Sequence, residues 1–126
     1  MSRTILVVDD NDMNRQLLTD VLSKSGYTVL PAENGSDGVA MAIKHTPDLI
    51  LMDIQMPIMN GLEAGKALRN DPRTKDIRML ALTSYNVLEG KDDFFQTGFD
   101  GYIEKPLNIR KVKEIIRSHL PDEENQ

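Results

Sequence analysis

The sequence predicts an α/β fold in which five parallel strands form one sheet and five helices cover its two faces. Two observations support this prediction. Five short apolar runs alternate along the chain with stretches whose apolar residues recur at helical spacing. The run at 49–52 has four consecutive apolar residues, as expected for a strand that is covered on both faces. Because right-handed crossovers of this length place helices on both sides of a parallel sheet, the alternation predicts a doubly wound topology.

The first strand and the first helix are expected at the N-terminus. Ile5–Val8 is a short β-rich run, and a helix is expected from about 12 to 24, where Gly26 follows as a natural stop. The inward face of this helix is expected to carry five apolar residues, namely Met13, Leu17, Leu18, Val21 and Leu22.

The second and third strands are expected on either side of a second helix. The second strand, 27–30, ends at Pro31. The helix is expected to begin at Asn34-Gly35 and to end at Thr46-Pro47, because the residue before a proline disfavours helical geometry. The third strand is 49–53. The inward residues of the second helix are expected to be Val39, Ala42 and Ile43.

Two further helices and one strand are expected after the third strand. Asn60 can cap a helix that stops by Asp71-Pro72, and 79–82 is the fourth strand. The helix at about 86–97 has the weakest apolar pattern, since a glycine and two aspartates dilute it. We expect it to be the most mobile helix of the fold.

The last strand and the last helix complete the alternation. The fifth strand is 101–104, and Asn108 is expected to cap the final helix. The inward face of that helix is expected to hold Ile109, Val112, Ile115, Ile116 and Leu120.

Composition limits the architecture and the classes of function. With 126 residues, of which 40% are hydrophobic, the chain is expected to form one domain over 1–121, followed by a short acidic tail at 122–126. The absence of cysteine excludes a thiol nucleophile and a cysteine zinc site. A formal net charge of -5 disfavours nucleic-acid binding. No apolar run approaches membrane-spanning length, so a cytoplasmic protein that does not bind membranes is expected.

Reactive polar residues follow four of the five strands. Asp9 and Asp10 follow the first strand, Asp53 ends the third, Thr83 the fourth, and Lys105 follows the fifth. In a doubly wound sheet these residues share the carboxyl edge, where ligands bind. If the strand order is 2-1-3-4-5, the first and third strands are neighbours and their three carboxylates crowd together. Two like charges about 4 Å apart cost on the order of 4 kcal/mol at an effective dielectric near 20, so a cation is expected among them.

The residue types at this edge indicate magnesium and phosphate chemistry. Oxygen ligands without histidine or cysteine favour Mg²⁺ over zinc, and Mg²⁺ commonly works with phosphate. A carboxylate nucleophile, a magnesium ion, a lysine and a hydroxyl are the groups that phosphoryl transfer requires. Asp53, Lys105 and Thr83 supply the three protein groups.

The motifs at the strand ends resemble the receiver domain of bacterial two-component response regulators. The resemblance runs over nearly the whole chain, with the motifs in order and at family spacing. They are Val7-Val8-Asp9-Asp10-Asn11, Leu51-Met52-Asp53-Ile54-Gln55-Met56-Pro57-Ile58-Met59-Asn60-Gly61, Leu82-Thr83-Ser84 and Gly101-Tyr102-Ile103-Glu104-Lys105-Pro106. The resemblance implies a flavodoxin-like sheet of order 2-1-3-4-5 and a single-domain, chemotaxis-regulator-like protein without an effector domain.

The resemblance also implies a role for each residue of the site. Asp53 would be the phosphoacceptor, and Asp9, Asp10 and Asp53 would hold Mg²⁺ together with the backbone carbonyl of Gln55. Lys105 would bind the phosphoryl group. Two further residues would form the conformational switch, the hydroxyl being that of Thr83 and the aromatic ring that of Tyr102. A cis peptide bond between Lys105 and Pro106 is expected.

The resemblance further implies the partners and the output. The phosphoryl donor would be a sensor histidine kinase or a histidine phosphotransfer protein, and an unknown downstream protein would receive the signal. The output face would combine the helix at 86–97, the strand at 101–104 and the final helix. The protein would catalyse only its own phosphorylation and dephosphorylation, and would not be an enzyme acting on other substrates. A relay intermediate that passes phosphate to a histidine phosphotransfer protein is the alternative.

Two other classes of protein share parts of this pattern. Aspartyl-nucleophile phosphatases of the haloacid dehalogenase type have a second acid two residues after the nucleophile, where this chain has Gln55. A flavodoxin-like cofactor carrier would bind phosphate after the first strand, where Asp9–Asp12 would repel it. The phosphorylated binding module is therefore favoured.

Overall fold

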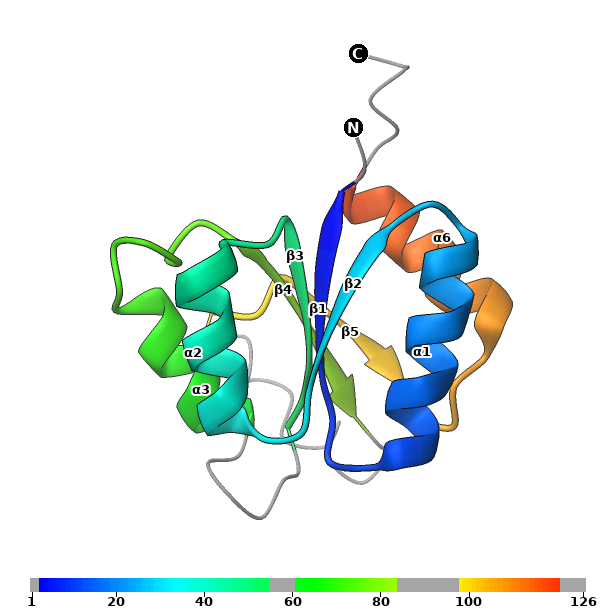
Figure 1. Cartoon of the computed structure of the whole chain (residues 1–126), viewed down its shortest axis with the longest axis horizontal. Coiled ribbons are helices and arrows are strands. Elements are labelled where there is room, and N and C mark those ends of the chain that lie inside the picture. Colours follow the sequence, from blue (N-terminus) through cyan, green and yellow to red (C-terminus); the bar gives the residue numbers. More distant parts are fainter. Residues whose placement is uncertain (1–2, 55–60, 84–97, 121–126) are drawn as a thin grey trace.

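Five parallel strands form one sheet in the order β2-β1-β3-β4-β5, which confirms the predicted fold class and strand order (Figure 1). The computed structural model describes residues 3–54, 61–83 and 98–120. Three expected features lie outside these residues. They are the helix at 86–97, the acidic tail, and Asn60, which was expected to cap the helix after the third strand. The elements are β1 (Thr4–Val8), α1 (Asp12–Lys24), β2 (Thr28–Ala32), α2 (Gly35–His45), β3 (Leu49–Asp53), α3 (Gly61–Arg69), β4 (Arg78–Thr83), β5 (Gly101–Glu104) and α6 (Ile109–His119).

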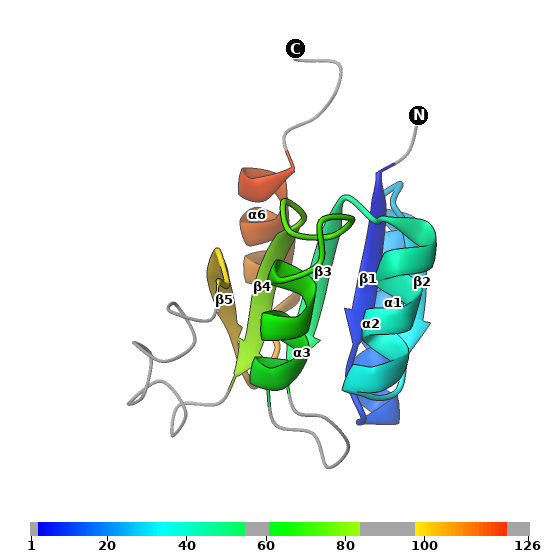
Figure 2. The same ribbon diagram turned by 90° about the vertical axis from the view of Figure 1, so that its left-hand side faces the viewer.

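Helices cover both faces of the sheet. Helices α2 and α3 lie on one face, and α1 and α6 lie on the other (Figures 1 and 2). Alternate residues of β1 face opposite cores. Leu6 packs in the core beneath α2 and α3, while Ile5 packs in the core beneath α1 and α6. Because both faces of the strand are covered, its sequence is a continuous apolar run. None of the described helices is long and apolar enough to cross a lipid bilayer.

Strand β3 lies at the centre of the sheet, between β1 and β4, and all five of its residues are buried. Its register pairs Met52 with Val8 and Asp53 with Leu82. The ends of β1, β3 and β4 are therefore level, and the residues that follow them share one edge. The strands all begin at the opposite edge, where α6 also ends (Figure 1).

Three of the helices begin at an asparagine cap. In each case the side-chain oxygen accepts a hydrogen bond from the backbone N–H three residues later, which satisfies a donor that the helix leaves unpaired. The caps are Asn11 on the N–H of Asn14, Asn34 on that of Asp37, and Asn108 on that of Lys111. Asn34 and Asn108 are the starts that the sequence predicted.

The structure corrects four details of the prediction. Strand β2 continues through Pro31 to Ala32, which an edge strand tolerates because its outer donors need no partner in the sheet. Met13 is 82% exposed and Leu17 is 36% exposed, although both were expected inside. At about 100° per residue, Met13 lies about 140° around the helix from the buried Leu18. Ile109, the first residue of α6, is 44% exposed.

Arg69, at the end of α3, joins the segments that lead into β4 and β5. Its guanidinium donates hydrogen bonds to the carbonyls of Lys75, Ile77 and Gly98 and to the Asp100 carboxylate. The Asp100 carboxylate also accepts a hydrogen bond from Met79 N, at 2.9 Å. One side chain thus sets where two strands begin, and so where their far ends lie.

Helix α2 approaches β1 closely at Gly38. A β-carbon at this position would lie 2.8 Å from Cγ2 of Val8, which is buried. We predict that Gly38→Ala lowers the free energy of unfolding by about 1–3 kcal/mol, because overpacking outweighs the better helix propensity of alanine. Urea denaturation measures the change. Ser36→Ala, on the exposed side of the same helix, is the control and is expected to change stability by less than about 0.5 kcal/mol. Unchanged stability in Gly38→Ala would contradict the prediction and would show that the Val8 side chain can move to make room for the added methyl group.

Candidate functional site

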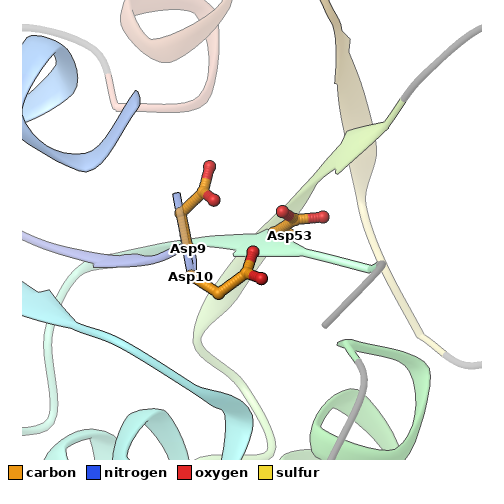
Figure 3. Close-up of side chains that lie close together, drawn as sticks. All are labelled: Asp9, Asp10 and Asp53. Carbon is orange, nitrogen blue, oxygen red and sulfur yellow. The ribbon is translucent and has the colours of Figure 1, made fainter. Parts of the chain in front are cut away.

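Three carboxylates meet at the carboxyl edge of the sheet. Asp9 and Asp10 follow β1 and Asp53 ends β3, and Figure 3 shows the three side chains close together. One oxygen from each lies within 4.8 Å of the others. Asp9 and Asp53 are buried, whereas Asp10 is exposed. The structure therefore brings together the acids that the strand pattern predicted, because their two strands are neighbours.

Lys105 reaches this cluster from the end of β5. Its Nζ atom lies 2.9 Å from Asp53 Oδ2 and 3.6 Å from Asp9 Oδ2. Its backbone N–H donates to the carbonyl of Thr83 at 2.7 Å, so the lysine is tied to the end of the neighbouring strand. The peptide bond between Lys105 and Pro106 is cis, which confirms the prediction.

Burial perturbs the charges at the site. The pKa of Asp9 is raised to about 6, mainly by burial and in addition by the nearby charge of Asp53. A hydrogen bond from Asn11 N and the charge of Lys105 act in the opposite direction. Burial alone would lower the pKa of Lys105, but the hydrogen bond and charge of Asp53, with the charge of Asp9, leave it raised. The Asp9 shift thus arises mainly from burial, and the Lys105 shift from its oppositely charged neighbours.

The donor set fits a hard divalent cation. Asp9 Oδ2 is buried and has no hydrogen-bond partner among the described residues. Three carboxylates and one lysine sum to a formal charge of -2, which one divalent ion balances. Carboxylate oxygens, with no histidine or cysteine in the cluster, are the ligands that Mg²⁺ prefers. The backbone carbonyl of Gln55, the further ligand expected from the sequence, lies outside the described residues.

The two expected switch residues lie on the neighbouring strands. Thr83 is the last residue of β4, next to β3, and is buried. Tyr102 lies on β5, pairs with Ala81 of β4, and is 39% exposed. The structure thus places the hydroxyl at the same edge as Asp53 and the ring on the adjacent edge strand.

Arg15 also contributes to the site, although the sequence pattern predicted no role for it. Its Nη1 atom donates to the carbonyl of Asp9 at 2.8 Å, and its Nη2 atom pairs with Asp12 and lies 3.8 Å from Glu33. It thereby connects the loop after β1 to the loop after β2. The spacing of three residues between Asp12 and Arg15 indicates their pairing, but nothing in the sequence shows that Arg15 reaches back to Asp9.

Comparisons with known proteins agree with this geometry. A family model described as response regulator receiver domain matches residues 5–117. The polar-differentiation response regulator DivK of Brucella anthropi is 36% identical over 122 residues, which cover 97% of this chain and 99% of that protein. The DivK protein of Brucella ovis is 35% identical with the same coverage.

Solved structures show the same fold. The chemotaxis protein CheY4 of Vibrio cholerae matches with a TM-score of 0.90 and 32% identity, covering 95% of this chain and 100% of that one. The receiver domain of a sensor histidine kinase from Pseudomonas aeruginosa matches with a TM-score of 0.88 and 25% identity, covering 97% and 100% of the two chains. That structure has a magnesium ion coordinated in its active site cleft.

The raised pKa of Asp9 predicts how the stability of the metal-free protein depends on pH. A carboxyl with a raised pKa binds its proton more tightly in the folded state than in the unfolded state. Its ionisation therefore lowers stability as pH rises from about 4 to 6, and the loss is complete above that range. We predict that Asp9→Asn raises the free energy of unfolding by about 1–3 kcal/mol at pH 7 and changes it little at pH 4.

Urea denaturation at several pH values in the presence of a chelator measures this effect. Asp20→Asn, a neutralisation at an exposed position of α1, is the control and should change stability little at either pH. Equal effects of Asp9→Asn at pH 4 and pH 7 would contradict the assignment of the raised pKa to Asp9.

Proposed function

Because the chain belongs to the response regulator receiver domain family, we propose that it is a phosphorylation-switched signalling protein that accepts a phosphoryl group on Asp53. The observation that supports this most directly is the setting of Asp53. It ends the central strand, is buried, and lies beside two other aspartates and 2.9 Å from the Lys105 ammonium. The proposal assigns the function to a single domain over 1–121.

Each residue of the site has a role in the proposed reaction. A carboxylate oxygen of Asp53 bonds to phosphorus while the bond from phosphorus to the donor nitrogen breaks. The bonding electron pair returns to that nitrogen, and the donor histidine leaves as neutral imidazole because its other ring nitrogen already carries a proton. Lys105, already hydrogen-bonded to Asp53, moves to the phosphoryl oxygens and offsets their charge. Asp9 and Asp10 hold the cation. When bound, Mg²⁺ neutralises the carboxylates and the incoming phosphoryl oxygens.

The similarity to relatives supports Mg²⁺ as the cofactor and a phosphohistidine protein as the donor. The Pseudomonas aeruginosa receiver domain with magnesium in its active site cleft shares 25% identity with this chain over 97% of its length. A sensor histidine kinase or a histidine phosphotransfer protein is the proposed donor. The output is proposed to be binding of a downstream protein, as expected for a member of the response regulator receiver domain family.

A relay intermediate is the second candidate function. Its support is that one similar structure is the receiver domain of a sensor histidine kinase. In that case the phosphoryl group would leave Asp53 for a histidine of a phosphotransfer protein. The haloacid dehalogenase-type phosphatase is not favoured, because Gln55 occupies the position of its general acid.

The first prediction from this function concerns the modification itself. We predict that acetyl phosphate, or a phosphohistidine protein, adds one phosphoryl group to the protein only when Mg²⁺ is present. A phosphoryl dianion cannot approach the three carboxylates while their charge is uncompensated. Intact-protein mass spectrometry should show one added phosphate, which is absent in Asp53→Asn and after chelation. The control variant Asp20→Asn should be labelled normally. Labelling that persists in Asp53→Asn would reject the assignment.

A further prediction concerns the switch. Phosphorylation places acceptor oxygens near Thr83, and its hydroxyl would be drawn toward them, which opens space for Tyr102. We predict that Thr83→Ala still accepts phosphate on Asp53 but loses the difference in partner affinity between the two phosphorylation states. Thr83→Ser keeps the hydroxyl and is expected to retain that difference. The measurement is the affinity of the identified partner for each phosphorylated variant. Equal affinities for phosphorylated wild type and Thr83→Ala would show that the signal leaves by another route.

A further inference from the structure

Gly61, the first residue of α3, lies against the backbone at the end of β3. A β-carbon at this position would lie 2.5 Å from Cα of Ile54 and 2.9 Å from the carbonyl carbon of Asp53, and the carbonyl oxygen of Asp53 would be closer than either. In proteins, β-carbons essentially never come within 3.0 Å of such atoms. Any residue with a side chain would therefore require the start of α3 or the end of β3 to move.

The space at this position, and not the conformational freedom of glycine, explains why glycine is found here. The φ angle of Gly61 is not positive, so an L-amino acid could adopt its backbone conformation. Gly38 and Gly98 also pack closely, but a β-carbon there would meet the side chains of Val8 and Arg69. A side chain can change its rotamer, whereas a peptide group at the end of a paired strand cannot yield in that way.

The peptide group that Gly61 contacts is also held by β4. Asp53 is paired with Leu82 of β4, and the N–H of Ile54 donates a hydrogen bond to the carbonyl of Leu82 at 3.3 Å. The Ile54 side chain is buried and belongs to the core beneath α2 and α3. The backbone from Asp53 to Ile54 is therefore fixed both by the sheet and by the start of α3.

This backbone carries the residue on which the proposed function depends. Asp53 Oδ2 lies 2.9 Å from Nζ of Lys105, and one oxygen of Asp53 lies within 4.8 Å of an oxygen of Asp9 and one of Asp10. A shift of the peptide after Asp53 changes these distances, because the short aspartate side chain follows its main chain. Misplacement of a reacting group by about 1 Å can reduce a rate by about 100-fold.

We propose that Gly61 is a positioning residue for phosphoryl transfer, an inference that rests on the proposed function of Asp53. Because Gly61 has no side chain, α3 packs directly against the peptide after Asp53. This contact fixes the carboxylate beside Lys105 and beside the other two acids. Gly61 acts through the backbone of Asp53 and is not itself a catalytic residue.

The test compares Gly61→Ala with Gly26→Ala. Gly26 lies between α1 and β2, at the edge opposite the carboxylates (Figure 1). A β-carbon there has open space, but the φ of 99° makes alanine unfavourable. Both variants add one methyl group and both are expected to lower stability, whereas the first alone disturbs Asp53. Measurements are made with trimethylamine N-oxide, which favours the folded state, and circular dichroism verifies that each variant is folded.

Two measurements report the position of the Asp53 carboxylate without any phosphoryl donor. The Mg²⁺ affinity of the unphosphorylated protein, measured by calorimetric titration, should fall about tenfold or more in Gly61→Ala and less than about twofold in Gly26→Ala. The carboxyl carbon resonance of Asp53 should shift in Gly61→Ala and keep its wild-type position in Gly26→Ala. A glycine with a purely structural role would leave both quantities unchanged in the folded variant.

The labelling rate of Asp53 is the third measurement. With acetyl phosphate and saturating Mg²⁺, the rate constant should fall about tenfold or more in Gly61→Ala and less than about twofold in Gly26→Ala. Gly61→Ser carries the same β-carbon and is expected to lose about as much as Gly61→Ala. A wild-type rate in folded Gly61→Ser would contradict the steric origin of the effect and would overturn the proposal.

Three further results would overturn the proposal. They are wild-type Mg²⁺ affinity and labelling rate in folded Gly61→Ala, equal losses in Gly61→Ala and Gly26→Ala, and failure of Gly61→Ala to fold under the stabilising conditions. The last result would show that the glycine serves folding alone. Absence of labelling in the wild-type protein would instead contradict the proposed function, and the Mg²⁺ titration and the Asp53 resonance would still test the role of Gly61.

Discussion

The rest of the structure depends on one constraint, which is the placement of two buried carboxylates beside one lysine. Asp9 and Asp53 are almost inaccessible to water, and Lys105 lies within 3.6 Å of both. Such an arrangement is unfavourable on its own, as the raised pKa of Asp9 shows. It persists because each of the three residues is attached to a strand whose neighbours are buried, and the packing of the sheet exceeds the electrostatic cost.

The supporting parts of the fold are therefore the ones that fix strand ends. The register of β1, β3 and β4 makes their carboxyl ends level, and Arg69 holds the starting ends of β4 and β5. On the other side of the site, Arg15 holds the Asp9 carbonyl. The candidate site residues are in this way placed by rigid elements, because each lies at the end of a strand or directly after it. A site with repelling charges requires this support, because a flexible loop would separate them.

Most of the sheet and most of the site could be predicted from the sequence, because both depend on local patterns. Strands covered on both faces appear as continuous apolar runs, and a parallel sheet brings their carboxyl ends to one edge. The exposure of Met13 and Ile109 could not be predicted in this way, since apolar residues near a helix end do not show which turn faces the sheet. The contact between Arg15 and Asp9 could not be predicted either, because the path of the loop after β1 determines it. The hydroxyl of Thr83 was found from its strand position alone.

The parallel topology also separates the chemistry from the ends of the folded chain. Strand β1 begins and α6 ends at the edge opposite the carboxylates (Figure 1). An affinity handle, a fluorescent reporter or a surface linker placed before β1 or after α6 would therefore start at the edge opposite Asp9 and Asp53. The protein could therefore be immobilised on a sensor chip by one end while the acidic edge stays open to solvent. The same geometry would suit its use as an exchangeable input module in synthetic signalling circuits.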